Sequence, residues 1–305
     1  MSSFRRAFWR YPLFQIPLMF LSLCLIASLL CWLLGLGRPK VAVAIALDLS
    51  TSTYGTQFNA PGTIMYQEVQ AVQSYLAENA QLRNANQVQI LGFGGVVQSL
   101  TGNEFKTDSK QVSDELTQAL QNPDLPQLVA NNTTDINAAI QKGTEALSGV
   151  SDRCRELLLV TDGLTDGSAN ISPKVISNAV ARKVKVNAIV VGADSPELKL
   201  TAFTTGGIYA SGETSNLQRF FTERFFTRFN SNRKWIILWL GAAWIALMWT
   251  LTLILDKFIF QGLFKLPMNL SGQLSLGNAL FWSVLTPIII WQIWKILDLP
   301  FFGSC

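Results

Sequence analysis

The sequence contains no histidine, and this absence excludes several kinds of catalytic site. Without an imidazole there is no Ser-His-Asp triad, no histidine-ligated zinc site and no histidine general base. Ser50 and Ser52 consequently have no such base to activate them, and Cys154 has no histidine partner that would make it a nucleophile. We therefore expect a protein that is not an enzyme.

Charged residues are also scarce: they make up 14% of the 305 residues, whereas hydrophobic residues make up 49%. Between residues 37 and 234 the numbers of basic and acidic side chains are equal, so nothing favours nucleic-acid binding. Of the four cysteines, Cys24 and Cys31 lie in an apolar first segment and Cys305 is the last residue. The polar middle of the chain therefore cannot form a disulfide within itself, and we expect Cys154 to be a free thiol.

Three apolar runs are long enough to cross the roughly 30 Å hydrocarbon core of a bilayer. The first, Phe14–Leu36, also resembles the core of a cleaved signal peptide, but it is unusually long and lacks a small-residue cleavage pattern. We expect it to be retained as a signal-anchor. Trp235–Leu255 contains no charged residue. Leu280–Leu297 carries Pro287 and, near its end, Lys295, whose side chain can reach the headgroups.

The flanks of these runs disagree on the orientation of the chain. In the short flanks of membrane spans, Lys and Arg concentrate on the cytoplasmic side of the membrane. The flanks on the side of the polar domain hold slightly more Lys and Arg than those on the other side, which by itself indicates a cytoplasmic domain. The signal-anchor form of the N-terminus, with Arg5, Arg6 and Arg10, and the domain's richness in Asn, Gln, Ser and Thr favour export instead. We predict a multi-pass protein of the bilayer with its domain on the exoplasmic side. The expected order is an N-terminal cytoplasmic tail and signal-anchor (1–37), a soluble domain (38–230), a second span (231–257), a loop (258–278), a third span (279–298) and a tail (299–305).

Within the soluble domain, apolar runs of strand length alternate with helical patterns, which is typical of βαβ units and a parallel sheet. A Gly94-Gly95 turn predicts an antiparallel hairpin at one sheet edge. The last helix, rich in Phe and Arg, either packs on the sheet or rests in the membrane interface. The expected strands are Val41–Leu47, Val88–Phe93, Val96–Leu100, Glu156–Thr161, Val184–Val191 and Ile208–Ala210. The expected helices are Ile64–Ala80, Ser109–Leu120, Asp135–Leu147, Pro173–Ala181, Pro196–Phe203 and Ser215–Phe229.

A cluster of oxygen-bearing side chains follows the first expected strand. Asp48-Leu49-Ser50-Thr51-Ser52 places one carboxylate and two serine hydroxyls in one turn. Small oxygen donors that leave one position free suit Mg²⁺, which prefers near-octahedral oxygen coordination. The ordinary alternative is helix capping, in which the same side chains accept hydrogen bonds from free backbone N–H groups.

Three separated segments, within a stretch from residue 40 to 229, resemble the von Willebrand factor A (vWA) family. They are the D-x-S-x-S pattern of Asp48–Ser52, the helix start Asn131–Ile140, and Glu156–Gly163, which resembles that family's fourth strand and acidic turn. The resemblance implies a Rossmann-like α/β domain, with a mostly parallel sheet covered by helices on both faces, and a metal-ion-dependent adhesion site (MIDAS). Thr133 is an alternative to Thr134 in this assignment. The metal ligands that the resemblance implies are Asp48, Ser50, Ser52, Thr134 and Asp162.

The positions of two acids support this site independently. In open α/β sheets, ligands bind beyond the carboxyl ends of the strands, where the strand order reverses. The first expected strand ends at Asp48 and the fourth ends just before Asp162. If these two strands are neighbours, both carboxylates face the same crevice.

The resemblance also implies a function and a cofactor. The cation would be Mg²⁺, Ca²⁺ or Mn²⁺, and an Asp or Glu of a partner protein would fill its free position. The combination with membrane spans loosely resembles the Bat group of the bacterial inner membrane, which is associated with MoxR-type AAA ATPases. We therefore expect a module for adhesion or for assembly and maturation of a protein complex. The alternatives are a structural subunit of a larger membrane complex and a metal-delivery factor for a client enzyme.

Overall fold

The computed structural model describes residues 11–55, 57–163, 170–192 and 194–297. Arg5, Arg6 and Arg10 of the expected cytoplasmic tail, and the expected C-terminal tail 299–305, lie outside these residues. These residues form two compact units, of which Pro39–Asn230 is one and the described segments on either side of it form the other. Each unit is described by itself.

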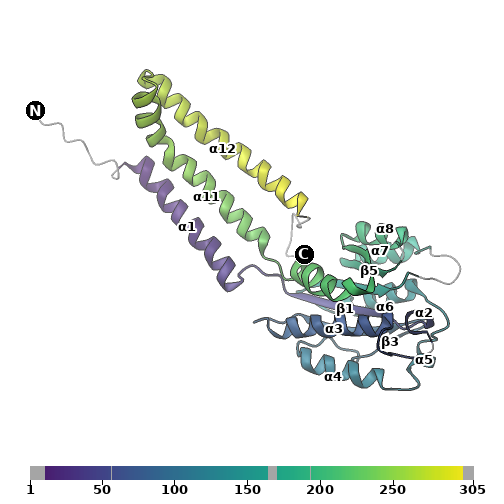
Figure 1. Cartoon of the computed structure of the whole chain (residues 1–305). Helices are drawn as coiled ribbons and strands as arrows, with labels where there is room; N and C mark the ends of the chain where they lie inside the picture. The colour runs from purple at the N-terminus through teal and green to yellow at the C-terminus, as the bar shows by residue number, and fades with distance from the viewer. Residues whose placement is uncertain (1–10, 56, 164–169, 193, 298–305) are drawn as a thin grey trace, which may run out of the picture. The chain divides into compact units, whose positions relative to one another are not determined.

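The domain is built on one six-stranded sheet in the order β3-β2-β1-β4-β5-β6 (Figure 1). Neighbouring strands run parallel except β2 and β3, which form the expected antiparallel hairpin at the edge. The predicted α/β fold class is confirmed. The strands are β1 Val41–Asp48, β2 Gln87–Phe93, β3 Val97–Ser99, β4 Cys154–Thr161, β5 Val184–Val191 and β6 Tyr209–Gly212.

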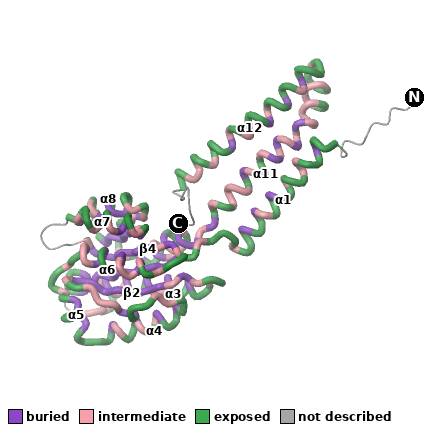
Figure 2. The backbone as a smooth tube through the Cα atoms, turned by 180° about the vertical axis from the view of Figure 1, so that it is seen from behind, coloured by how far each residue is buried: buried purple, intermediate pink, exposed green. Residues whose placement is uncertain are grey.

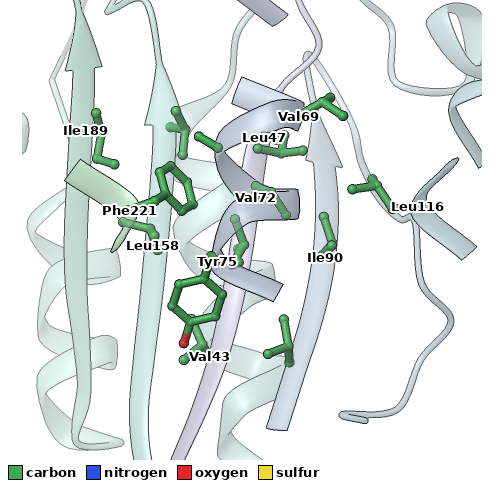
Figure 3. Close-up of a cluster of buried hydrophobic side chains, with 14 of the residues drawn as sticks. Val43, Leu47, Val69, Val72, Tyr75, Ile90, Leu116, Leu158, Ile189 and Phe221 are labelled. Carbon is green, nitrogen blue, oxygen red and sulfur yellow. The ribbon is translucent and has the colours of Figure 1, made fainter. Parts of the chain in front are cut away.

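Helices cover both faces of this sheet because its central strands are apolar on both sides. In β1, Val43 and Leu47 belong to one buried cluster, whereas the alternating Ala42 and Ala46 belong to the other. The first cluster includes α3, α4 and the C-terminal helical segment, and part of it is drawn in Figure 3. The second cluster includes α6, α7 and α8. The helices are α2 Thr51–Tyr54, α3 Ile64–Ala80, α4 Ser109–Leu120, α5 Leu125–Leu128, α6 Ile136–Ser148, α7 Pro173–Ala181 and α8 Pro196–Thr205.

The C-terminal helical segment of the domain packs on the sheet, as the first of its two interpretations expects. Phe221 and Phe225 are fully buried in the same cluster as Tyr75 of α3, and the rings of Tyr75 and Phe221 meet edge to face. Its middle is a π-helix, which the sequence pattern did not indicate. The segment consists of η2 Thr214–Asn216, α9 Leu217–Arg219, η3 Phe220–Phe226 and α10 Thr227–Phe229.

The second unit contains three helices that are long and apolar enough to cross a membrane. They are α1 Pro12–Leu34, α11 Arg233–Ile254 with its π-helical continuation η4 Leu255–Leu263, and α12 Met268–Ile296. Helix α11 packs against both α1 and α12. Figure 2 shows that α1 and α12 expose most of their residues, as lipid-facing helices would.

The third of these helices begins well before its expected start. The segment 258–278, expected as a loop, is mostly helical, because η4 extends to Leu263 and α12 begins at Met268. The serine- and glycine-containing first turns of α12 have little hydropathy, but the Ser271 hydroxyl donates to the Asp256 carbonyl at 2.9 Å. Hydropathy identifies the apolar core of a span and not the ends of its helix, so the sequence placed this boundary wrongly.

Cys154, the first residue of β4, also differs from expectation. It is disulfide-bonded, so the prediction of a free thiol is wrong. That prediction considered only cysteines in the domain's own stretch of sequence, and distance along the chain does not exclude pairing.

Candidate metal centre

The site lies where the strand order reverses, between β1 and β4. These strands are paired in parallel, with Leu47 opposite Val160, so Asp48 and Asp162 follow neighbouring positions at the same edge of the sheet. The expectation that the two strands are neighbours is confirmed. Ligands of open α/β sheets bind in such a position.

The turn after β1 holds the two serine hydroxyls side by side. Ser50 Oγ lies 3.0 Å from Ser52 Oγ, and the Ser50 N–H donates to Asp48 Oδ1 at 3.0 Å. The Thr53 hydroxyl donates to the carbonyls of Asp48, at 3.0 Å, and Ser50, at 2.8 Å, which fixes the turn. Ser50 is the N-cap residue of α2, yet its side chain accepts no capping hydrogen bond. The capping alternative therefore does not explain these hydroxyls.

Asp48 is fully buried, and its carboxylate is held by hydrogen bonds on both oxygens. Thr161 Oγ1 donates to Asp48 Oδ2 at 2.6 Å, and it accepts from the Gly163 N–H at 3.1 Å. Burial and, to a lesser extent, the nearby Asp162 raise the pKa of Asp48, the hydrogen bonds from Ser50 and Thr161 lower it, and the result is a pKa of about 6. Thr161 thus ties the ends of β1 and β4 together, a role that its position in an apolar strand did not indicate.

The loop that carries the candidate threonines is joined to this turn by backbone hydrogen bonds. The Thr51 N–H donates to the Asn131 carbonyl at 2.9 Å. Thr133 Oγ1 donates to the Ala130 carbonyl at 3.4 Å, whereas the half-buried Thr134 makes no side-chain hydrogen bond with any described residue. Of the two alternatives, Thr134 is the one whose hydroxyl is not already engaged.

The glycines of the edge hairpin let this loop approach. The Asp135 N–H donates to the Gly94 carbonyl at 2.8 Å, and the Gly95 N–H donates to the Ala130 carbonyl at 3.0 Å. A Cβ atom at Gly94 would lie 2.7 Å from the Val129 carbonyl oxygen, and one at Gly95 would collide with the Thr133 hydroxyl. The glycine pair, predicted only as a turn, therefore also positions the threonine loop.

One acid near the site was missed by the sequence interpretation. Glu68 of α3 is fully buried, and neither of its carboxylate oxygens has a hydrogen-bond partner among the described residues. Burial raises its pKa well above the usual value, and the charges of Asp48 and Asp162 raise it further. The signal was present in the sequence, because Glu68 interrupts the apolar stripe of the expected helix Ile64–Ala80.

The residues present fit a hard divalent cation. The structure brings Asp48, Ser50 and Ser52 together in one turn, places Asp162 close enough to act on the charge of Asp48, and joins the Thr134 loop to the same turn. The donors are carboxylates and hydroxyls only, which Mg²⁺ and Ca²⁺ prefer. Buried Glu68, whose oxygens have no hydrogen-bond partner among the described residues, adds an acid whose ionised form a cation would stabilise.

Comparison with known proteins agrees with this fold. Residues 43–164 match the family model described as the von Willebrand factor type A domain. No curated protein matches the chain in sequence. Three solved structures are similar to it, and the two with a TM-score of 0.50 show likeness of fold alone. They are a von Willebrand factor type A protein from Catenulispora acidiphila (16% identity, TM-score 0.50, covering 63% of this chain and 43% of that one), proximal thread matrix protein 1 from the mussel byssus (17%, 0.50, 63% and 48%), and an aerotolerance-related membrane protein from Bacteroides fragilis (16%, 0.46, 60% and 98%). The chain thus spans less than half the length of the first two.

Proposed function

We propose that this chain, which carries a von Willebrand factor type A domain, binds a partner protein through a divalent cation held at a MIDAS. The residues that would hold the cation are Asp48, Ser50, Ser52, Thr134 and Asp162. The partner would supply an Asp or Glu side chain, and the role would be adhesion or the assembly and maturation of a protein complex. By the resemblance to the Bat group, a MoxR-type AAA ATPase would be one such partner.

The observation that carries this proposal is the pair of serine hydroxyls 3.0 Å apart beside the buried Asp48, with no capping role. A bound divalent cation supplies a positive charge to which an external carboxylate binds. Hydroxyls neutralise that charge less than carboxylates would, so much of it remains available. Asp48 is kept in place by Ser50 and Thr161, so the chain's part is to present preordered oxygens at the sheet edge.

The membrane setting belongs to the same proposal. The three apolar helices would anchor the chain in the bacterial inner membrane, with the domain on the exoplasmic side. The disulfide at Cys154 supports this side, because disulfides persist in oxidising compartments and are rare in the cytosol. Digestion of sealed right-side-out membranes with protease tests it: an exoplasmic domain is degraded without detergent, and a cytoplasmic one is protected.

Calorimetric titration of the full-length protein in detergent with Mg²⁺ and Mn²⁺ tests the cation site. Asp48→Ala removes the buried carboxylate and Thr134→Ala removes the loop hydroxyl. We expect each to weaken cation binding about a hundredfold or more, since ligand removal leaves the ion incompletely coordinated. Thr133→Ala is the matched control, because the Thr133 hydroxyl already donates a hydrogen bond to the Ala130 carbonyl. This variant should bind the cation as the wild type does. Wild-type affinity in the Asp48 and Thr134 variants would contradict the proposal.

Capture of the partner tests the second half of the proposal. Thr51 is exposed beside the serine pair, so a photo-crosslinker at this position would lie next to a bound partner. Crosslinking in whole membranes should give a discrete product in Mg²⁺ that disappears with EDTA and in the Asp48→Ala background. A product that is indifferent to both would show that the partner does not bind through the cation.

A further inference from the structure

Glu68 occupies a position where the fold calls for an apolar residue. Helix α3 packs on the sheet through a buried stripe that includes Met65, Val69, Val72 and Tyr75, part of which is drawn in Figure 3. Glu68 lies within this stripe and has 0% exposure. Burying a carboxylate without hydrogen bonds is costly, and such groups in a native structure call for a physical explanation.

The surroundings of Glu68 make its burial still less favourable without a cation. Both of its oxygens lack a hydrogen-bond partner among the described residues, and none of the ion pairs in that part of the chain involves it. The charged groups that act on it are Asp48 and Asp162, and both carry the same sign. The acids at the end of β1, just after β4 and in α3 therefore disfavour one another's ionised forms, and with burial this raises the pKa of Glu68 well above its usual value.

A divalent cation at that edge would favour the ionised form of all three acids. We propose that Glu68 is a positioning residue of the cation site, whose buried charge lies behind Asp48 and Asp162 and raises the affinity for a divalent cation. Among the described residues, no three Asp, Glu or Cys side chains converge closely enough to hold a metal themselves. Glu68 would therefore act on the cation through the electric field of its carboxylate and not as a ligand. This inference rests on the proposed function of the same site.

The test compares cation affinity with the stability of the metal-free protein. Glu68→Gln keeps the shape of the side chain and removes its charge. In full-length protein in detergent we expect Mn²⁺ and Mg²⁺ to bind about tenfold more weakly, because a nearby charge at low dielectric is lost. The melting temperature of the metal-free variant should be unchanged or higher, because a buried carboxyl group without hydrogen-bond partners among the described residues is also lost. Weaker cation binding without a loss of metal-free stability is not expected of a merely structural residue, whose substitution lowers stability.

Three further variants complete the design. Glu78→Gln makes the same chemical change at an exposed position of the same helix and should leave both quantities unchanged. Glu68→Asp keeps the charge and should retain more of the affinity than Glu68→Gln. Glu68→Met suits the apolar stripe, and it gives the same prediction of weaker binding with higher stability if the Gln variant folds poorly.

The outcomes separate this inference from the proposed function. If the wild type and Glu68→Gln bind equally while Asp48→Ala does not bind, the cation site stands and the role of Glu68 is overturned. If the Glu68 variants lose stability and affinity together and Glu68→Asp rescues neither, Glu68 is a structural residue. If the wild type binds no divalent cation, both proposals fall.

Discussion

The two ends of strand β4 each have a buried glutamate nearby, and the two differ in what surrounds them. Glu156, near the start of the strand, accepts from Asn187 Nδ2 at 2.9 Å and lies 3.8 Å from Lys185 Nζ. Burial raises its pKa, but Lys185, Asn187 and Arg228 lower it. Glu68, at the other end, has no hydrogen-bond partner among the described residues, and the charges that act on it are those of Asp48 and Asp162.

This difference separates a structural acid from one that needs an external charge. The protein itself supplies the groups that stabilise Glu156, so its burial needs nothing further. At the site edge the chain concentrates acidic groups instead, in the position where an open α/β sheet binds its ligand. The comparison predicts that a substitution near the start of β4 changes the stability of the protein, whereas a substitution at the site near its end changes the affinity for the cation.

The largest effect on cation affinity should come from pH, because protonation of Asp48 acts directly on the site that would hold the cation. Asp48 must be ionised to hold a cation, and its pKa is raised to about 6. Below pH 6 the affinity for Mg²⁺ should fall by about tenfold per pH unit, since protons compete with the metal. Titrations between pH 5 and 8 measure this; a flat profile would show that Asp48 does not hold the cation.

The same shift predicts the pH dependence of metal-free stability. The pKa of Asp48 is higher in the folded state than its usual value of 3.8, so the folded protein binds the proton more tightly. Its contribution to stability is complete below 3.8 and is lost as pH rises from there to about 6. The metal-free melting temperature should therefore fall over this range, less so in Asp48→Asn.

At the opposite end, Glu156→Ala should change stability and leave affinity alone. The substitution leaves Asn187 and Lys185 without their acceptor in a buried region, which should cost about 1–3 kcal/mol of unfolding free energy. Denaturant unfolding without metal measures this loss. Mg²⁺ affinity should equal that of the wild type; a parallel loss of affinity would remove the distinction between the two ends.

The smallest effect should come from the residue that links β1 and β4 at the site. Thr161→Val keeps the shape of the side chain and removes the hydroxyl that donates to Asp48 Oδ2. We expect a stability loss of about 1 kcal/mol and a severalfold weaker Mg²⁺ affinity, because the carboxylate loses one of its fixed hydrogen bonds. If affinity is unchanged, Thr161 supports the fold and does not position Asp48.

The sequence predicted the central strands well because these strands are almost entirely buried. Val41–Leu47 is a continuous apolar run, and Val184–Val191 is interrupted only by Lys185 and Asn187, so the strand type is visible in the pattern. The neighbouring positions of Asp48 and Asp162 follow from the same runs together with the rules for parallel sheets.

What the sequence did not reveal depends on contacts between distant residues. The hydrogen bond from Thr161 to Asp48 joins residues 113 positions apart, and the isolation of Glu68 is a property of its surroundings. The start of α12 at Met268 is set by helical hydrogen bonding and not by hydropathy. The disulfide at Cys154 depends on the folded path of the chain.

The most direct test of the account is a crystal structure of the protein grown with Mn²⁺, whose anomalous signal locates the ion. The account predicts one peak at the end of β1, about 2.0–2.3 Å from the hydroxyls of Ser50 and Ser52, with Thr134 and Asp162 turned toward it. Glu68 should lie behind these ligands without touching the ion. A Mn²⁺ ion bound elsewhere, or Thr134 and Asp162 turned away from the serine pair at saturating Mn²⁺, would contradict it.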